Sequence, residues 1–479
     1  MKRRTTIILF FAILTLGAFL RFYHLGARQL WLDEILQLQS FSQPTLQENL
    51  RRVADDLAQV PLSYLVQDLF IEAWGHSEWP ARFHAALAGT LSLPLLFWLG
   101  SRLFSERVAL LAMLVYAVYP LHQRYSQEGR SYALFVFLAL AAQCLLLCAL
   151  ERGNLRRWAA YALCVTLALY TNYFGLLVLF YQGFFVLGLR RRGLRACDSR
   201  PATHDSNCGQ DARTIFPGGR DVLNFGLAGG VALVGFAPWA WITFRTTHSN
   251  VSEDILPIVL HRFVREISGG SYALGILLVT LFCLGLWALW QTGQRGQVWL
   301  LLCWFLLPLA AALFLDWLRD YFFAIRQVLF ATPALALGVA AGIDAFPRRL
   351  PQAAARAGFG LLVALVVIAS LTVVYRRSGK EPADWKAVAS YLKIHVRPND
   401  RVAAPNTLNV LSYYFPEVEQ RGIDIEALSE RQSSGRVYLV ASIYMTPEQH
   451  RKVSTLLESS GGVERIEFRG FKVHILKAD

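Results

Sequence analysis

Eleven apolar runs follow one another along the chain, separated by short polar or basic segments. A helix that crosses a bilayer needs about 17 to 25 mostly apolar residues, and several of these runs are near the lower limit. The chain is 55% hydrophobic and only 17% charged, which is too apolar for an ordinary soluble protein. The sequence therefore predicts an α-helical polytopic membrane protein with about 11 transmembrane helices, at 5–20, 84–101, 107–121, 131–150, 157–172, 174–189, 222–244, 271–290, 298–315, 324–345 and 357–375.

The basic residues predict how the chain is oriented. Lys2, Arg3 and Arg4 precede the first apolar run, and no small-x-small cleavage site follows that run, so it is interpreted as an uncleaved first span with its basic end in the cytoplasm. Alternate loops then carry the arginine clusters at 152–157, 190–195 and 348–356. This pattern predicts a bacterial inner-membrane protein with a cytoplasmic N-terminus and an extracytoplasmic C-terminus. It also accounts for the net charge of +13 without nucleic acid as a partner.

Composition divides the chain into two predicted domains. Residues 1–375 form the transmembrane domain, with an external first loop at 21–83 and a cytoplasmic loop at 193–221 whose polar, aperiodic composition predicts disorder. Residues 376–479 have the composition of a small extracytoplasmic α/β domain. Its expected elements are helices at 384–396 and 446–459 and strands at 436–442 and 471–476, and the first helix carries Trp385, Val388, Ala389 and Leu392 on one face.

Two adjacent carboxylates, Asp33 and Glu34, follow Trp31 at the start of the long first loop. Neighbouring residues on a helix point about 100° apart, so one carboxylate can face a cavity while the other binds a neighbour. The alternative is structural: acidic residues favour a helix N-terminus, and a tryptophan suits the membrane interface.

The motifs around this acidic pair resemble the dolichyl-phosphate-mannose protein mannosyltransferases and their bacterial relatives, which include the lipid A aminoarabinose transferases. The matching elements are Trp31–Glu34, Pro61–Leu65, Arg82 and Tyr125–Leu134, the last reading Tyr-Ser-Gln-Glu-Gly-Arg-Ser-Tyr-Ala-Leu. The resemblance implies a membrane glycosyltransferase with the GT-C fold that takes a sugar from a polyprenyl-phosphate donor. It implies a lipid, glycan or protein as the acceptor and the membrane as the setting.

One departure from the family concerns the acceptor or metal region. Where the family has His-Pro-Pro-Leu, this chain has Gln59 followed by Val-Pro-Leu, so the histidine is missing. Asp55 or Asp56 could replace it, and Tyr64 and Glu128 complete this candidate region.

Sugar transfer from a lipid phosphate needs a base close to the attacking hydroxyl and cations on the departing phosphate. Following the resemblance, Asp33 is assigned as the general base and Glu34 as the residue that positions it. Arginine suits the phosphate because its planar fork binds two oxygens at once, and the candidates are Arg82, Arg130 and Arg326. The alternatives are a snorkelling Arg326 at a membrane boundary and a structural ion pair between Glu128 and Arg130.

The sequence assigns no cofactor. Neither the seven cysteines nor the scattered histidines have metal-ligand spacing with partners, and a divalent cation stays an open alternative. Two other functions stay open. A flippase of lipid-linked saccharides predicts internal repeats and charges within the spans, whereas a non-catalytic polyprenyl-phosphate-binding protein is compatible with the missing histidine. The sugar and the acceptor are not specified by the sequence.

Overall fold

The computed structural model describes residues 3–55, 59–198, 219–245, 263–319, 324–346, 351–377, 383–425, 435–459 and 463–476. It divides into two compact units. The first comprises Met1–Leu25 and Gln43–Ser378, and is called the membrane unit here. The second, called the C-terminal unit, comprises Gly26–Ser42 and Gly379–Asp479. The sequence-based division had placed residues 26–42 in the transmembrane domain, whereas the structure groups them with the C-terminal residues.

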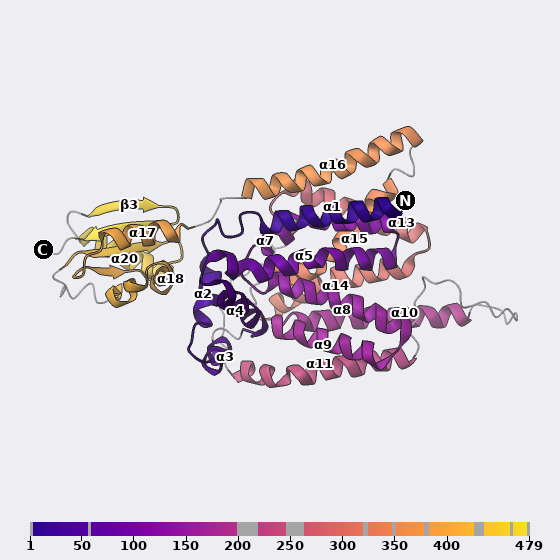
Figure 1. Cartoon of the computed structure of the whole chain (residues 1–479), viewed down its shortest axis with the longest axis horizontal. Helices are drawn as coiled ribbons and strands as arrows, with labels where there is room; N and C mark the ends of the chain where they lie inside the picture. The colour runs from indigo at the N-terminus through magenta and orange to yellow at the C-terminus, as the bar shows by residue number, and fades with distance from the viewer. Residues whose placement is uncertain are drawn as a thin grey trace. The chain divides into compact units, whose positions relative to one another are not determined.

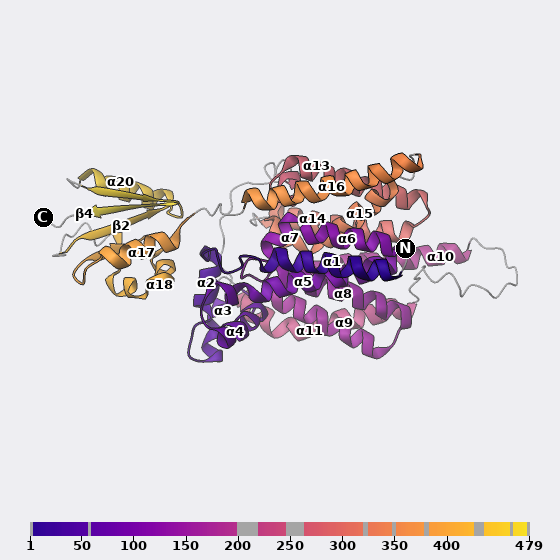
Figure 2. The same ribbon diagram turned by 45° about the horizontal axis from the view of Figure 1, so that its top comes forward.

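The membrane unit is a bundle of helices (Figure 1). Its elements are α1 (Arg3–Phe22), α3 (Leu46–Asp55), α4 (Leu62–Trp74), α5 (Glu78–Leu103), α6 (Glu106–Val118), α7 (Pro120–Tyr125), α8 (Tyr132–Arg152), α9 (Leu155–Thr171), α10 (Gly175–Asp198), α11 (Gly219–Arg245), α13 (Tyr272–Gln291), α14 (Arg295–Arg319), η1 (Ile325–Ala331), α15 (Thr332–Ala345) and α16 (Gln352–Arg377). The short helices α3 and α4 lie at the end of the bundle opposite the N-terminus of the chain (Figures 1 and 2). Of the predicted loop at 193–221, residues 199–218 lie outside the described residues.

Eight helices of the described chain are long and apolar enough to cross a membrane. The three other predicted runs are helical but shorter or more polar: 107–121 lies in α6 and α7, 157–172 in α9, and 174–189 in α10. The run at 107–121 is not one helix, because Tyr119 leaves helical geometry (φ −65°, ψ 115°) and Pro120 begins α7. The polytopic membrane class is thus confirmed, and the count of eleven spans stays a prediction.

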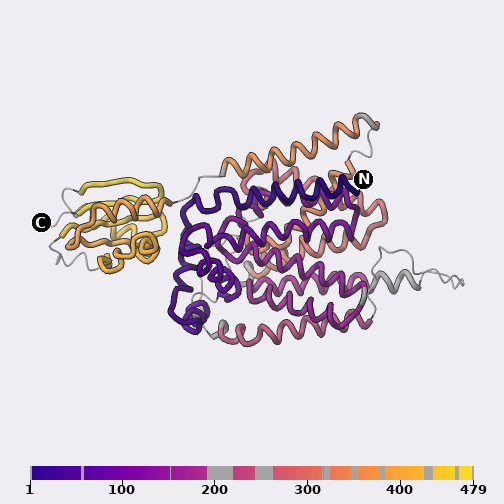
Figure 3. The backbone as a smooth tube through the Cα atoms, in the orientation of Figure 1, coloured from indigo at the N-terminus to yellow at the C-terminus, as the bar shows by residue number. Residues whose placement is uncertain are grey.

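Small residues allow two helices of the bundle to approach closely. On α15, Gly338 and Gly342 face Gly285 of α13, and a Cβ atom added at Gly285 would collide with the Gly338 carbonyl oxygen. Small residues four positions apart are a common means of close packing between membrane helices. Long helices of the bundle, including α5 and α8, run side by side along it, as the backbone trace in Figure 3 shows.

The C-terminal unit contains a four-stranded sheet in the order β1-β2-β4-β3 (Figure 2). Its elements are α2 (Leu32–Ser40), α17 (Trp385–His395), β1 (Arg401–Ala403), α18 (Leu408–Tyr414), η3 (Pro416–Arg421), β2 (Val437–Ser442), α20 (Pro447–Ser459), β3 (Glu464–Phe468) and β4 (Phe471–Leu476). Strands β1 and β2 are parallel, and the other pairs are antiparallel. The predicted small α/β fold is confirmed, including the buried face of α17 formed by Trp385, Val388, Ala389 and Leu392.

Candidate active site

The acidic pair begins helix α2, and its two carboxylates have different surroundings. Glu34 is buried, and its Oε2 accepts a hydrogen bond of 3.1 Å from the backbone N–H of Trp31, so it caps its own helix. Asp33, in the first turn, is only half-buried. The structure thus gives Glu34 a local structural contact and leaves Asp33 as the more accessible carboxylate of the pair.

The C-terminal residues hold the segment that leads into α2. The backbone N–H of Leu30 donates to the Tyr414 hydroxyl at 2.8 Å. Gln29 lies against α17: its Oε1 accepts from the Lys386 N–H at 2.9 Å, and its Nε2 donates to the Ala383 carbonyl. These contacts fix the backbone three residues before Asp33. They make the C-terminal unit the support of the candidate base.

The Tyr414 contact gives a direct test of that support. In Tyr414→Phe the Leu30 N–H loses its acceptor, and we expect kcat to fall by about threefold to tenfold with an unchanged KM for the donor. Tyr391→Phe, which removes a hydroxyl elsewhere in the same unit, is the matched control. Steady-state kinetics of the two variants would check the prediction, and equal rates for Tyr414→Phe and wild type would contradict it.

The candidate cation Arg82 lies near the start of α5, next to the loop that carries Arg130. Arg82 is buried and donates from Nη1 to the Leu25 carbonyl at 3.2 Å. The Nε2 of Gln67, on α4, donates to the carbonyls of both Ala81 and Gly129, at 2.7 and 3.1 Å. One amide therefore ties together the residues directly preceding the two arginines, which are 48 positions apart in the sequence.

The packing of the Arg130 loop against Ala81 and Gln67 leaves no room for a side chain at Gly129. A Cβ atom at this position would lie 2.7 Å from the Ala81 carbonyl oxygen and 3.0 Å from the Gln67 Nε2. We expect Gly129→Ala to displace the loop and to destabilise the protein by about 1–3 kcal/mol, with reduced transfer. Gly230→Ala is the control, since nothing lies within 4 Å of a Cβ there. Thermal unfolding and transfer assays of both variants would check this, and a Gly129→Ala protein as stable and active as the control would contradict it.

Arg326, on η1, joins the same motif from a distant part of the sequence. Its guanidinium lies 5.8 Å from the centre of the Tyr132 ring, and Tyr132 packs edge-on against Tyr125 at 5.1 Å. Burial raises the pKa of Tyr125, and Glu128 adds to this rise, so the hydroxyl stays protonated at neutral pH. Glu128 itself pairs with Arg124 at 2.9 Å. Arg326 therefore packs against the motif.

The structure describes only part of the predicted acceptor or metal region. The Gln59 carbonyl accepts hydrogen bonds from the Tyr173 hydroxyl at 3.3 Å and the Trp239 Nε1 at 3.0 Å, and Tyr64 is buried. Asp55 ends α3, but its side chain, like all of Asp56, lies outside what the structure describes. Across the described ranges, no group of three or more His, Cys, Asp and Glu side chains could hold a metal ion.

A buried polar network that the sequence analysis missed connects α1 with the motif. Arg21, fully buried, donates to the His122 Nδ1 at 2.8 Å and to the carbonyl of Ala117 at 3.1 Å. Burial, and then the charge of Arg21, lowers the pKa of His122 well below its usual value, so this imidazole is a neutral acceptor. The sequence feature that could have indicated this network is Arg21 at the end of an apolar run, together with His122, a histidine that the sequence analysis weighs only as a metal ligand.

Gln127 of the motif extends the same connection. Its Nε2 donates to the carbonyls of Leu20, Arg21 and Tyr23, at 3.1 to 3.2 Å, where α1 ends. The Tyr-Ser-Gln-Glu-Gly-Arg segment is thus fixed to α1 by Gln127 and to α4 and α5 by Gly129. Its residues have positioning roles that the pattern alone did not indicate.

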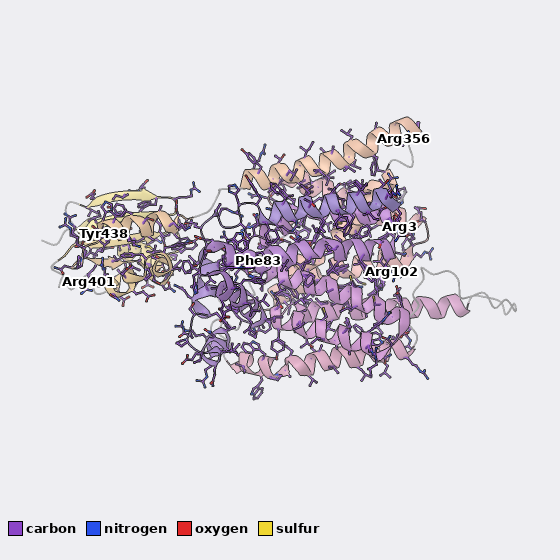
Figure 4. All side chains as sticks on the ribbon, viewed as in Figure 1. Arg3, Phe83, Arg102, Arg356, Arg401 and Tyr438 are labelled. Carbon is purple, nitrogen blue, oxygen red and sulfur yellow. The ribbon has the colours of Figure 1, made fainter. Side chains whose placement is uncertain are left out.

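Three arginines lie at the end of the membrane unit away from the site region. Phe83, next to Arg82, lies at one end of the bundle, whereas Arg3, Arg102 and Arg356 lie at the other (Figure 4). On α5 the separation follows from helix geometry, since 20 residues between Arg82 and Arg102 span about 30 Å.

Similarity to solved structures covers almost the entire chain. The crystal structure of ArnT from Cupriavidus metallidurans bound to undecaprenyl phosphate aligns with a TM-score of 0.59 at 15% identity, covering 98% of this chain and 97% of that one. The apo form of the same protein aligns with a TM-score of 0.62. The chain has an ArnT-like GT-C fold. The Archaeoglobus fulgidus oligosaccharyltransferase AglB, in complex with an inhibitory peptide and a dolichol-phosphate, shares this fold with a TM-score of 0.53 at 12% identity, covering 99% of this chain and 74% of AglB.

A family model matches part of the sequence and agrees with the GT-C fold. Residues 58–197 match the family model of dolichyl-phosphate-mannose-protein mannosyltransferase. This range contains Gln59, Tyr64, Arg82, Glu128 and Arg130, whereas the acidic pair and Arg326 fall outside it. No curated protein matches the sequence significantly. The fold and the family model together confirm the resemblance drawn from the motifs, and the protein is a membrane protein of a glycosyltransferase fold.

Proposed function

We propose that the chain is an inverting glycosyltransferase that transfers a sugar from a polyprenyl-phosphate donor to an acceptor at the outer face of the bacterial inner membrane. The observation that carries the proposal is the GT-C fold itself, aligned over nearly the full length of an ArnT that binds undecaprenyl phosphate. The packing of Arg82 beside the loop of Arg130 adds support, because it provides two cations on adjoining segments.

The proposed reaction is a single displacement. The acceptor oxygen forms a bond to the anomeric carbon on the face opposite the phosphate, and the bond between that carbon and the phosphate oxygen breaks. Polyprenyl phosphate leaves with the electron pair as a stable anion, so no separate general acid is needed. Asp33 takes the proton of the attacking hydroxyl, with Glu34 holding the helix start, and Arg82, Arg130 and Arg326 stabilise the departing phosphate.

Charge distribution supports the proposed orientation. Positively charged residues accumulate on the cytoplasmic side of membrane proteins. Arg3, Arg102 and Arg356 gather at the end of the bundle away from Phe83 (Figure 4), which favours a cytoplasmic location for that end and an outer location for the site. An extracytoplasmic C-terminal unit is part of the same proposal.

Donor hydrolysis tests the proposal without knowledge of the acceptor. Purified protein is incubated in detergent with a panel of radiolabelled polyprenyl-phosphate sugars, with and without a chelator, and released sugar is measured. We expect slow release from at least one donor, and the chelator arm decides whether a divalent cation takes part. Tight binding of a donor without turnover would instead identify a non-catalytic polyprenyl-phosphate-binding protein, and transport of an intact lipid-linked sugar would identify a flippase.

A further inference from the structure

The C-terminal unit contains a cavity of about 490 Å³ beside the end of β1. This volume falls within the range of about 300–1,000 Å³ that is typical of small-molecule sites. Its wall comes from three parts of the unit: the turn after β1 with the start of α18, η3 with the segment after it, and α20. All the residues that line it belong to the C-terminal unit.

Two amide side chains form one wall of the cavity. Asn406 Nδ2 donates to Gln449 Oε1 at 2.8 Å, and Gln449 Nε2 donates to Asn406 Oδ1 at 3.0 Å. A side-chain amide has two donor hydrogens and two acceptor lone pairs, so this pairing uses half of the capacity of Asn406. Asn406 also has a left-handed backbone (φ 57°), which is uncommon outside glycine and places this amide at the turn.

A buried hydroxyl on the same wall supplies an independent indication of a ligand. Thr407 is fully buried, and within the described part of the chain its Oγ1 has no hydrogen-bond partner. Leaving a buried polar group unsatisfied costs about 1–3 kcal/mol, so such groups are uncommon in folded proteins. Thr407 is among the residues that line the cavity, so this wall contains a polar group whose hydrogen-bonding capacity is unused.

The charges on the cavity indicate which class of ligand fits. Glu419 and Asp424 line it together with Lys452, so carboxylates outnumber cations. Lys452 is in addition paired with Glu448 at 3.1 Å. Such a wall repels phosphate and other anions, whereas carboxylates and amides readily accept and donate hydrogen bonds to neutral hydroxyl groups.

We propose that this cavity is a sugar-binding site, taking the neutral polyhydroxylated ring of a glycan or of a lipid-linked sugar. Its position connects it with the candidate base. Asn409 lines the cavity, and its carbonyl accepts a hydrogen bond from Gln39 of α2, the helix that begins with Asp33. A sugar in the cavity would therefore lie against the start of α18, the helix to which Gln39 of α2 is bonded. The proposal concerns binding alone and does not depend on the proposed transfer reaction.

Two variants alter the cavity while preserving the local fold. Asn406→Gly removes one amide and suits the left-handed backbone. Gln449 accepts a hydrogen bond from the Thr446 N–H at 2.9 Å, as the third residue of a capping box, and Gln449→Glu keeps that acceptor while removing the amide donor. Arg451→Gln, on the same helix but not lining the cavity, is the matched control.

The experiment measures sugar binding by the full-length protein in nanodiscs, because glycoside detergents would occupy a sugar site. Methyl glycosides of glucose, galactose, mannose, arabinose and N-acetylglucosamine are titrated by ligand-observed NMR, with inorganic phosphate as the anion arm. We expect saturable binding of at least one glycoside, and a Kd raised about tenfold in Asn406→Gly and Gln449→Glu but not in Arg451→Gln. Absence of saturable binding across the panel, or equal Kd values in all variants, would overturn the proposal.

Competition identifies the source of the sugar. If a polyprenyl-phosphate sugar displaces the bound glycoside and bare polyprenyl phosphate does not, the cavity takes the sugar of the lipid donor. If neither displaces it, the cavity takes a glycan from another source, as a glycosylated acceptor would provide. Displacement by bare polyprenyl phosphate or by inorganic phosphate would show that the cavity binds anions, contrary to the proposal.

Discussion

Asp33→Asn should lower sugar release from a polyprenyl-phosphate donor by about 10²- to 10⁴-fold, the usual contribution of a general base. The substitution keeps the size of the side chain, and asparagine remains compatible with a helix start, so the protein should still fold and insert. The expected loss is in kcat, because the amide cannot take the proton of the attacking hydroxyl or water. The measurement is initial-rate release of radiolabelled sugar by purified variants.

Two further variants make this result interpretable. Glu48→Gln removes a carboxylate from the first turn of α3 and should leave the rate unchanged. Glu34→Gln retains an acceptor for the Trp31 N–H and should therefore preserve the helix start better than Glu34→Ala. Full activity of Asp33→Asn would remove the base assignment and would favour the structural interpretation of the acidic pair as a helix N-terminus.

Arg82→Gln is expected to have the second large effect, a fall in kcat/KM of about 10²- to 10³-fold. The loss arises because glutamine has neither the charge nor the planar fork that binds two phosphate oxygens. Binding of polyprenyl phosphate should weaken in parallel, which a titration with the bare lipid phosphate would detect. Arg102→Gln, with the same change of charge at the opposite end of the same helix, should bind and react like wild type.

Burial of Arg82 requires a second arginine variant as a check on folding. The side chain donates to the Leu25 carbonyl, so its loss can affect stability as well as phosphate binding. Arg130→Gln changes a half-buried arginine on the adjoining loop and should weaken lipid-phosphate binding with less effect on thermal unfolding. If both variants unfold normally and bind polyprenyl phosphate with wild-type affinity, the assignment of these arginines to the phosphate is wrong.

Hydrophobic patterns in the sequence predicted the membrane helices and the buried face of α17. The predicted apolar runs are helical, because hydrophobicity sustained over a span specifies a membrane helix almost alone, although 107–121 and 324–345 are each divided between two helices. The face of α17 followed from helical periodicity. By contrast, β1 has only three residues and β3 has a mostly exposed pattern, so neither carries the alternation that identifies a strand.

The surroundings of the candidate site depended on contacts that no local pattern specifies. The motifs indicated Arg82 and the loop of Arg130, yet the Gln67 amide that joins their segments is an ordinary glutamine in the sequence. The same holds for Tyr414 and Leu30, which meet across 384 positions through a hydroxyl and a backbone amide. Pairings of this kind follow from tertiary structure rather than from residue periodicity.

Gly26–Ser42 belongs to the C-terminal unit although it comes early in the sequence, and this has a consequence for biogenesis. Synthesis proceeds from the N-terminus, and α2 is made long before α17 and α18, the helices that hold it. During translation the segment before Asp33 therefore lacks its contacts with Ala383, Lys386 and Tyr414 until those residues have been made. A chain that stalls or is cut before residue 414 would insert its membrane helices without a positioned Asp33. Under the proposed function, we expect such a truncated chain to be inactive even where its membrane helices are in place.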